Sequence, residues 1–136
     1  MYTLHPQLAD ETVPVCDLEL CRVLLSRDAN YPWLVLSPRR DGLRDLHDLN
    51  DADGIAVLEE IRRCSQALVD LYRPEKMNVA ALGNQVPQLH IHIIARFTTD
   101  PAWPGPVWGR VPAADYDDAA RDSLISRLRA ALGQNG

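Results

Sequence analysis

Two histidines separated by a single residue, His90 and His92, form the part of this sequence best suited to chemistry. Residues 88–93 alternate between polar and apolar side chains, and Gln88 shares the polar phase with both histidines. Alternation with a period of two is typical of a strand with one apolar face and one open face. We therefore expect a strand that presents Gln88, His90 and His92 in a row on its open face.

One hypothesis is that His90 acts as a nucleophile. A neutral imidazole held in one tautomer attacks phosphorus or carbonyl centres, and a neighbour two residues along the strand can bind the developing charge or the leaving group. The turn formed by Gly83, Asn84 and Gln85 precedes the strand, and its backbone N–H groups can converge on an anion. This combination indicates a phosphate site.

Two other interpretations of the same histidines remain open. A His-x-His pair on a strand can hold a metal ion, but a catalytic zinc ion requires about three protein ligands. Gln88 is a poor third ligand, and further ligands such as His5 or His47 would have to come from other parts of the chain. Alternatively, the histidines are only tolerated on an exposed face, an explanation that suits one histidine better than two in register.

The composition is that of a soluble globular protein, and 136 residues suffice for one domain with an ordinary hydrophobic core. The net charge of −5 disfavours non-specific binding to nucleic acid. No apolar run of about 18 residues could span a membrane, and the first residues lack a basic start and an apolar stretch. We therefore expect a cytoplasmic protein with no nucleic-acid or membrane partner, and its three cysteines are expected to be reduced thiols.

Two hairpins are predicted around the histidine strand. Apolar residues over 18–25 and 33–36 predict two strands, and the short turn between them implies antiparallel pairing. Residues 77–82 predict a third strand, which a five-residue loop over 83–87 joins to the histidine strand. Together the two hairpins predict an antiparallel sheet.

A long helix is predicted from Asn50 or Asp51, either of which can cap it, to about Tyr72, because its apolar residues recur at helical spacing. A second helix is predicted from about residue 115 to residue 132, with Gly133 as its stop. With helices on one face of the sheet, the fold class is α+β, in a single domain over residues 1–136.

The remaining segments are expected to be less regular. Residues 3–12 suit a short helical turn or loop that Pro14 ends. Residues 97–109 contain three prolines, two glycines and two tryptophans, and are expected to form an extended, ordered loop.

The stretch Gln88-Leu89-His90-Ile91-His92-Ile93-Ile94 resembles the histidine triad (HIT) signature, which is His-x-His-x-His followed by two apolar residues. Residues 33–39, an apolar strand that ends in proline and arginine, resemble the upstream strand of that family. The resemblance covers roughly residues 18–110, and only the signature is highly specific. It implies a HIT-like fold and a nucleotide-binding hydrolase or transferase that acts at the α-phosphate through a nucleotidyl-histidine intermediate.

The resemblance also implies roles for individual residues. His90 takes the position of the family's nucleophile, and His92 that of the histidine that contacts the phosphoryl group or the leaving-group oxygen. Asp28 corresponds to an acidic residue that holds the ribose hydroxyls. The implied nucleotide-binding residues on the second hairpin are Asn78, Gly83, Asn84 and Gln85.

Two positions depart from the family pattern. Gln88 stands in place of the first signature histidine, and Trp33 in place of a histidine usual on the upstream strand. A glutamine can hydrogen-bond but carries no proton at neutral pH, so the acid step, the rate and the leaving-group preference depend on these changes. Because the nucleophile His90 is retained, catalysis is still expected, with Gln88 orienting the histidine row.

The function expected from the sequence is hydrolysis or transfer at a nucleoside phosphoramidate or a dinucleoside polyphosphate. The partner is then a small-molecule nucleotide, and the resemblance implies a homodimer whose sheet continues across the two-fold axis. No cofactor or metal is expected, because the ligands that a zinc-dependent branch of the family needs are missing from the sequence. The alternative is a non-catalytic protein that binds purine nucleotides.

Overall fold

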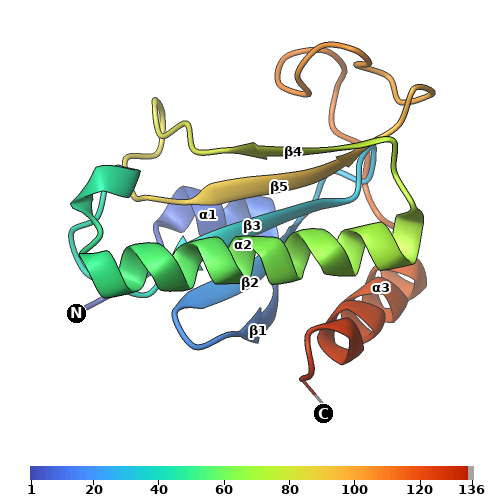
Figure 1. Ribbon diagram of the computed structural model, residues 1–136. Coiled ribbons are helices and arrows are strands. Elements are labelled where there is room, and N and C mark those ends of the chain that lie inside the picture. The colour runs from blue at the N-terminus through green and yellow to red at the C-terminus, as the bar shows by residue number, and fades with distance from the viewer. Residues whose placement is uncertain (135–136) are drawn as a thin grey trace.

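The computed structural model describes residues 1–134. Within these residues, three α-helices, one short 3-10 helix (η1) and five strands follow one another (Figure 1). In order they are α1 (Pro6–Glu11), β1 (Thr12–Asp17), β2 (Cys21–Ser26), β3 (Trp33–Pro38), η1 (Leu46–Asp48), α2 (Asp51–Tyr72), β4 (Lys76–Ala80), β5 (Ile91–Arg96) and α3 (Asp118–Ala131). None of these helices is both long and apolar enough to cross a membrane, within the residues described.

The five strands form one antiparallel sheet in the order β1-β2-β3-β5-β4. The predicted hairpins are both present, since β2 pairs with β3 and β4 pairs with β5. The pairing of β3 with β5 joins the two hairpins and sets Val35 opposite His92. The α+β fold with an antiparallel sheet is therefore confirmed.

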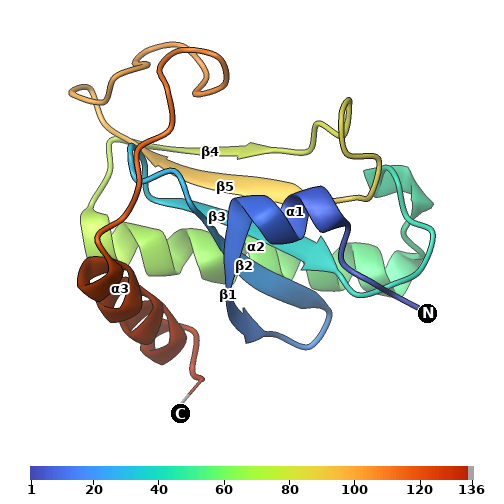
Figure 2. The ribbon, with the colours of Figure 1, turned by 180° about the vertical axis from the view of Figure 1, so that it is seen from behind.

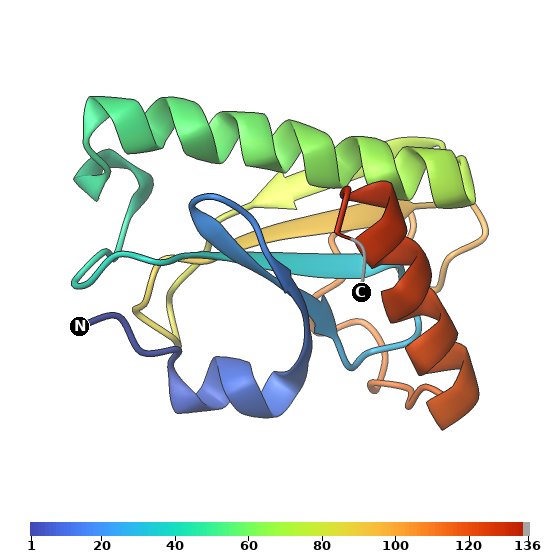
Figure 3. The ribbon, with the colours of Figure 1, turned by 90° about the horizontal axis from the view of Figure 1, so that it is seen from below.

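The hydrophobic core lies between one face of the sheet and the helices α2 and α3. Ile91, Ile93 and Ala95 of β5 point into this core, and Cys64 and Leu68 of α2 meet them from the other side. The helix α1 lies on the opposite face of the sheet from α2 (Figures 2 and 3). One face of the sheet thus packs against the hydrophobic core, and α1 lies on the other face.

The long helix α2 agrees with the sequence prediction at both ends. The Asn50 side chain caps it by accepting a hydrogen bond from the Asp53 N–H at 2.8 Å, and Tyr72 is its last residue. The C-terminal helix α3 is shorter than predicted and begins at Asp118. The three cysteines are free thiols, as expected.

The strand β1 was not predicted from the sequence, which indicated only a helical turn or loop that ends at Pro14. Pro14 lies inside β1, opposite Leu24 of β2. A proline cannot donate a ladder hydrogen bond, but β1 is an edge strand, where the missing donor would face away from the sheet. The pairing shifts register between Pro14 and Cys16, as in a bulge.

The histidine strand also differs from the prediction at its start. It begins at Ile91 and not at Gln88, because residues 81–90 form a loop longer than the expected five residues. The alternation from Ile91 onward is confirmed, with Ile91 and Ile93 in the core and His92 on the opposite face. The predicted row of three side chains is wrong for Gln88, because its side chain binds the N-terminal backbone, away from His90 and His92.

Candidate active site

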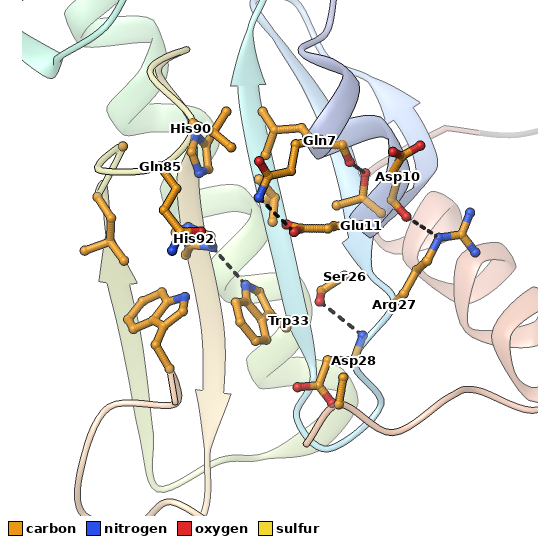
Figure 4. A pocket seen from close by; sticks show the side chains of 18 of the residues that line it. Gln7, Asp10, Glu11, Ser26, Arg27, Asp28, Trp33, Gln85, His90 and His92 are labelled. Atoms are coloured by element: carbon orange, nitrogen blue, oxygen red, sulfur yellow. Dashed lines mark hydrogen bonds between the residues drawn. The ribbon is translucent and has the colours of Figure 1, made fainter. Parts of the chain in front are cut away.

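A cavity of about 650 Å³ lies on the face of the sheet that α2 does not cover (Figure 4). Strands β2, β3 and β5, helix α1, the loop before β5 and the segment around residue 113 all contribute to it. Its polar and aromatic lining comprises Gln7, Asp10, Glu11, Thr12, Ser26, Arg27, Asp28, Trp33, Asn84, Gln85, His90, His92, Trp108 and Asp115. The cavity therefore gathers residues from both ends of the sequence around the two histidines.

The imidazole of His90 is held in one tautomer by the chain itself. Its Nδ1 atom lies 2.7 Å from the carbonyl oxygen of Gln88. A carbonyl oxygen only accepts, so Nδ1 carries the proton and donates it to this bond. The other ring nitrogen, Nε2, then carries a lone pair, which is the form of histidine that attacks an electrophile.

The imidazole of His92 is held in the opposite tautomer. The indole Nε1–H of Trp33, which is only a donor, donates to Nδ1 of His92 at 3.0 Å. The neutral ring of His92 therefore carries its proton on Nε2. Burial, and secondarily the electrostatic influence of the adjacent His90 ring, lower the pKa of His92 to about 4, so the ring is neutral at pH 7.

The two histidines therefore offer complementary atoms side by side. Their ring centroids are 4.9 Å apart, and only 6% of His90 and 8% of His92 is exposed. His90 presents an acceptor nitrogen and His92 presents a donor N–H, and neither Nε2 atom is hydrogen-bonded within residues 1–134. Such a pair can attack a phosphorus centre with one ring and hydrogen-bond to its oxygen with the other.

Two tryptophans surround His92 with aromatic edges. Trp33 and Trp108 each meet His92 in an edge-on arrangement, with centroid separations of 5.6 Å and 5.0 Å. Trp108 comes from the loop after β5, and its ring centroid is also 5.9 Å from that of Trp33. This apolar surround accounts for the burial that keeps His92 uncharged.

Asp28 lines the cavity on the β2–β3 turn, at a distance along the sheet from the histidines (Figure 4). Its Oδ1 atom accepts hydrogen bonds from the backbone N–H and the side-chain amide of Asn30 and from the N–H of Ala114. These bonds fix the carboxylate and leave Oδ2 without a partner in the described chain. The remaining oxygen can accept a hydroxyl, as a ribose-binding role requires.

The turn predicted to bind phosphate does line the cavity. Gly83, Asn84 and Gln85 are all part of its wall, next to His90. Gly83 has φ +78°, a left-handed conformation that glycine adopts without strain. His90 and Gly83 also line a second, smaller space of about 230 Å³ with Arg44 and His47. Open space thus adjoins His90 on two sides.

Two residues predicted for the site lie elsewhere. The Asn78 side chain accepts a hydrogen bond from Arg96 at 2.8 Å, and Asn78 does not line the cavity. The Gln88 side chain binds the backbone of the N-terminal segment, also outside the cavity. Their places in the sequence pattern did not reveal these partners, which come from distant parts of the chain.

Several lining residues were not predicted from the sequence. Gln7, Asp10 and Glu11 come from α1, about 80 residues before the histidines, and Asp115 comes from the segment after the loop. Trp33 was identified only as a departure from the family pattern, although its N–H sets the tautomer of His92. No spacing in the sequence links these residues to the signature, because the fold alone brings them together.

No group of three or more histidine, cysteine, aspartate or glutamate side chains suited to hold a metal ion occurs among residues 1–134.

The HIT domain family matches residues 8–99, which is more than half of the chain. This chain belongs to the histidine triad family. The match includes the last four residues of α1, Trp33 and both histidines, so most of the residues that line the cavity lie within the matched range.

Solved structures of histidine triad proteins share the whole fold. One from Bradyrhizobium japonicum is 45% identical, with a TM-score of 0.95 and alignment over 96% of this chain and 98% of that chain. One from Marinobacter aquaeolei is 42% identical, with a TM-score of 0.95 over 98% of this chain and 97% of that chain. A third, from Sinorhizobium meliloti, is 35% identical, with a TM-score of 0.93 over 96% of each chain.

A more distant protein shares the fold alone. A histidine triad nucleotide-binding protein from Sulfolobus tokodaii, described as hypothetical, is 17% identical, with a TM-score of 0.64 over 90% of this chain and 85% of that chain. A comparison with curated proteins found no match.

Proposed function

We propose that this protein is a nucleotide hydrolase or transferase that cleaves at the α-phosphate of a nucleoside phosphoramidate or a dinucleoside polyphosphate. Family membership supports a nucleotide-binding hydrolase or transferase in general terms. The observation that carries the finer proposal is the opposite tautomers of His90 and His92. One ring has a free lone pair, and its neighbour has a free N–H.

In the proposed reaction, Nε2 of His90 attacks the α-phosphorus. A bond forms between this nitrogen and phosphorus while the bond from phosphorus to the leaving oxygen or nitrogen breaks; a phosphate leaves as its anion, and a leaving nitrogen takes a proton from solvent water. The Nε2–H of His92 donates to a phosphoryl oxygen, where negative charge must be held throughout. Water, or the hydroxyl of another acceptor in a transfer reaction, then attacks phosphorus. Its oxygen bonds to phosphorus as the nitrogen–phosphorus bond breaks, its proton passes to solvent, and Nε2 of His90 regains its lone pair.

The other lining residues have matching roles in this proposal. Asp28 accepts a ribose hydroxyl through Oδ2, and the backbone amides of Gly83–Gln85 hold phosphate oxygens. The side chains of Trp33 and Trp108 keep water from His92 and so keep it neutral. Because the rings are fixed before the substrate arrives, little reorganisation is needed during the reaction.

An activity screen tests this proposal most broadly. Purified protein, treated exhaustively with a zinc chelator, is assayed on adenosine phosphoramidates and on dinucleoside polyphosphates with chain lengths from three to five phosphates. Turnover of one class, with release of adenosine 5′-monophosphate (AMP), is the expected result. Tight nucleotide binding without turnover of any substrate would instead favour a non-catalytic purine-nucleotide-binding protein.

We also propose that the protein forms a homodimer through the edge of its sheet at β4. This strand has β5 on one side only, and Val79 and the nearby Leu82 are about half exposed. An unpaired, apolar strand edge can pair with a second copy about a two-fold axis. Sedimentation at micromolar concentration should give about twice 15.2 kDa, and a stable monomer would contradict this arrangement.

A further inference from the structure

The side-chain amide of Gln88 is bound twice to one short segment of backbone. Its Oε1 atom accepts a hydrogen bond from the N–H of His5, and its Nε2 donates to the carbonyl oxygen of Thr3, each at 2.8 Å. These partners lie 83 and 85 residues away in the sequence. Gln88 therefore joins the loop that carries His90 to the residues that lead into α1.

The helix that begins at this segment forms one wall of the cavity. Gln7, Asp10 and Glu11 of α1 line the cavity, and Figure 4 shows Gln7 and Glu11 on the side of the cavity across from His92. His5, whose N–H binds Gln88, also caps α1, because its ring Nδ1 accepts from the N–H of Gln7 at 3.1 Å. One residue thus connects the amide of Gln88 to the first turn of the wall.

A helix of six residues has almost no stability of its own. Its position depends on what attaches it to the rest of the protein. The buried side chain of Leu8 and the bond from the Thr12 hydroxyl to the Leu8 carbonyl fix its C-terminal half. The bonds from Gln88 fix the segment that enters its N-terminal half.

We propose that Gln88 is a positioning residue, which fixes α1 as a wall of the nucleotide cavity and does not act at phosphorus. This inference rests on the proposed function. Both polar atoms of the amide are already bonded to backbone, and the side chain lies outside the cavity of His90 and His92. The link from Gln88 to the nucleophile is its backbone carbonyl, which a substitution of the side chain retains.

This division of roles predicts a split between binding and turnover. Gln88→Ala should weaken AMP binding, and raise KM, by about tenfold, the size of effect expected from one or two lost neutral hydrogen bonds. The kcat should stay within about threefold, because the carbonyl that holds His90 remains. Hydrogen exchange over residues 5–11 should become faster. The matched control is Gln66→Ala. Gln66 is an exposed residue of α2 whose side chain is hydrogen-bonded to Asp70, and its replacement should leave AMP affinity, KM, kcat and exchange over residues 5–11 unchanged.

The partner residue allows a double-mutant cycle in the full chain. His5→Pro removes the N–H donor at a residue whose φ of −55° suits proline, while His5→Ala keeps the N–H and removes only the ring. Adding Gln88→Ala should weaken AMP binding about tenfold in the His5→Ala background and only about threefold in the His5→Pro background.

Two outcomes would overturn the inference. One is a fall in kcat of about a hundredfold in Gln88→Ala with AMP affinity and exchange over residues 5–11 unchanged, which would place the amide at the reaction. The other is an equal loss of AMP affinity on adding Gln88→Ala to the His5→Ala and His5→Pro variants. Absence of AMP binding to the unaltered protein would instead overturn the proposed function, and the exchange measurement would still decide whether Gln88 holds α1.

Discussion

Buried polar side chains lie at both ends of β5: Arg96 is its last residue, and His90 and His92 flank its first residue, Ile91. The hydrogen-bonding groups at the two ends are satisfied to different extents. Arg96 is 2% exposed, and all three of its guanidinium nitrogens donate hydrogen bonds, to Asp100, Asn78 and the carbonyl of Gly105. His90 and His92 are nearly as buried, yet each has one ring nitrogen bonded and the other without a partner in the described chain.

This difference separates a scaffold from a site. A buried charge with every nitrogen hydrogen-bonded is held in one place by the structure, and here it fixes the loop that carries Trp108. A buried imidazole with one free nitrogen keeps the capacity to bind or attack a ligand, at some cost to stability. The His90 end of β5 should therefore control activity, and the Arg96 end should control folding.

The largest expected effect is on turnover at the histidine end. His90→Asn removes the nucleophilic Nε2, while the new side-chain amide can still donate to the Gln88 carbonyl. Turnover should fall at least about 10³-fold, toward the upper part of the range for a lost catalytic group. Urea denaturation should show a free energy of unfolding within about 1 kcal/mol of the unaltered protein. A loss of activity below tenfold would mean that His90 is not the nucleophile.

At the other end, Asp100→Ala should act on stability. It leaves the Arg96 guanidinium buried without its carboxylate partner, which should lower the free energy of unfolding by about 3–5 kcal/mol. The control is Asp122→Ala, which removes an exposed partner of Arg121 and should cost at most about 1 kcal/mol. Similar losses in the two variants would show that the Arg96 end is not the scaffold described above.

The two ends should also differ in their response to acid. The pKa of His92 is lowered to about 4 by burial and by His90, so the unfolded chain binds this proton more readily than the folded one. The stability that depends on neutral His92 should be lost as pH falls from about 6.5 to about 4.

Asp100 should respond at lower pH. Burial alone would raise the pKa of this carboxyl, but hydrogen bonds from Arg96 and from backbone N–H groups outweigh burial and lower it to about 2. Its contribution to stability should be present above about pH 3.9 and lost as pH falls toward 2. Urea denaturation of the unaltered protein and of His92→Asn from pH 7 to pH 2 checks both expectations. The His92→Asn variant should lack the loss of stability between pH 6.5 and 4. An identical pH profile would contradict the assignment to His92.

A smaller effect is expected from the residue that orients His92. Trp33→Phe keeps an aromatic ring, though a smaller one, and removes the N–H that donates to Nδ1 of His92. We expect kcat to fall about tenfold, the equivalent of one hydrogen bond, with little change in AMP affinity. Nitrogen-15 NMR of the histidine rings should show the Nε2–H tautomer of His92 in the unaltered protein and a mixture in the variant. A single tautomer in both would remove this role from Trp33.

Much of this account could be predicted from the sequence where local rules decide the structure. The cap at Asn50 and the apolar spacing of α2 fixed its position, and the alternation of Ile91 and Ile93 identified their face of β5. The strand β1 was missed because Pro14 is a breaker in most contexts, and only the pairing partners show that it lies on a sheet edge.

The site was predictable only near the signature. His90, His92 and the turn at Gly83 lie within a few residues of one another, so their order in the sequence carries over to space. Asn78 fitted the family pattern and Gln88 the alternation of the histidine strand, but their partners are Arg96 and the N-terminal backbone, which the sequence does not place nearby. The choice of partner depends on tertiary contacts that no local pattern encodes.

The central claim is that His90 forms a bond to phosphorus, and trapping the intermediate tests it most directly. A substrate labelled in its α-phosphate is mixed with the protein and quenched under denaturing alkaline conditions during the first turnover, since a phosphohistidine bond is labile in acid and stable in base. We predict label bound to the protein in one-to-one ratio with active sites and located at His90 by peptide mapping. Label on His92 would contradict the claim by making that residue the nucleophile. No bound label during turnover would also contradict it and would mean that water attacks phosphorus directly.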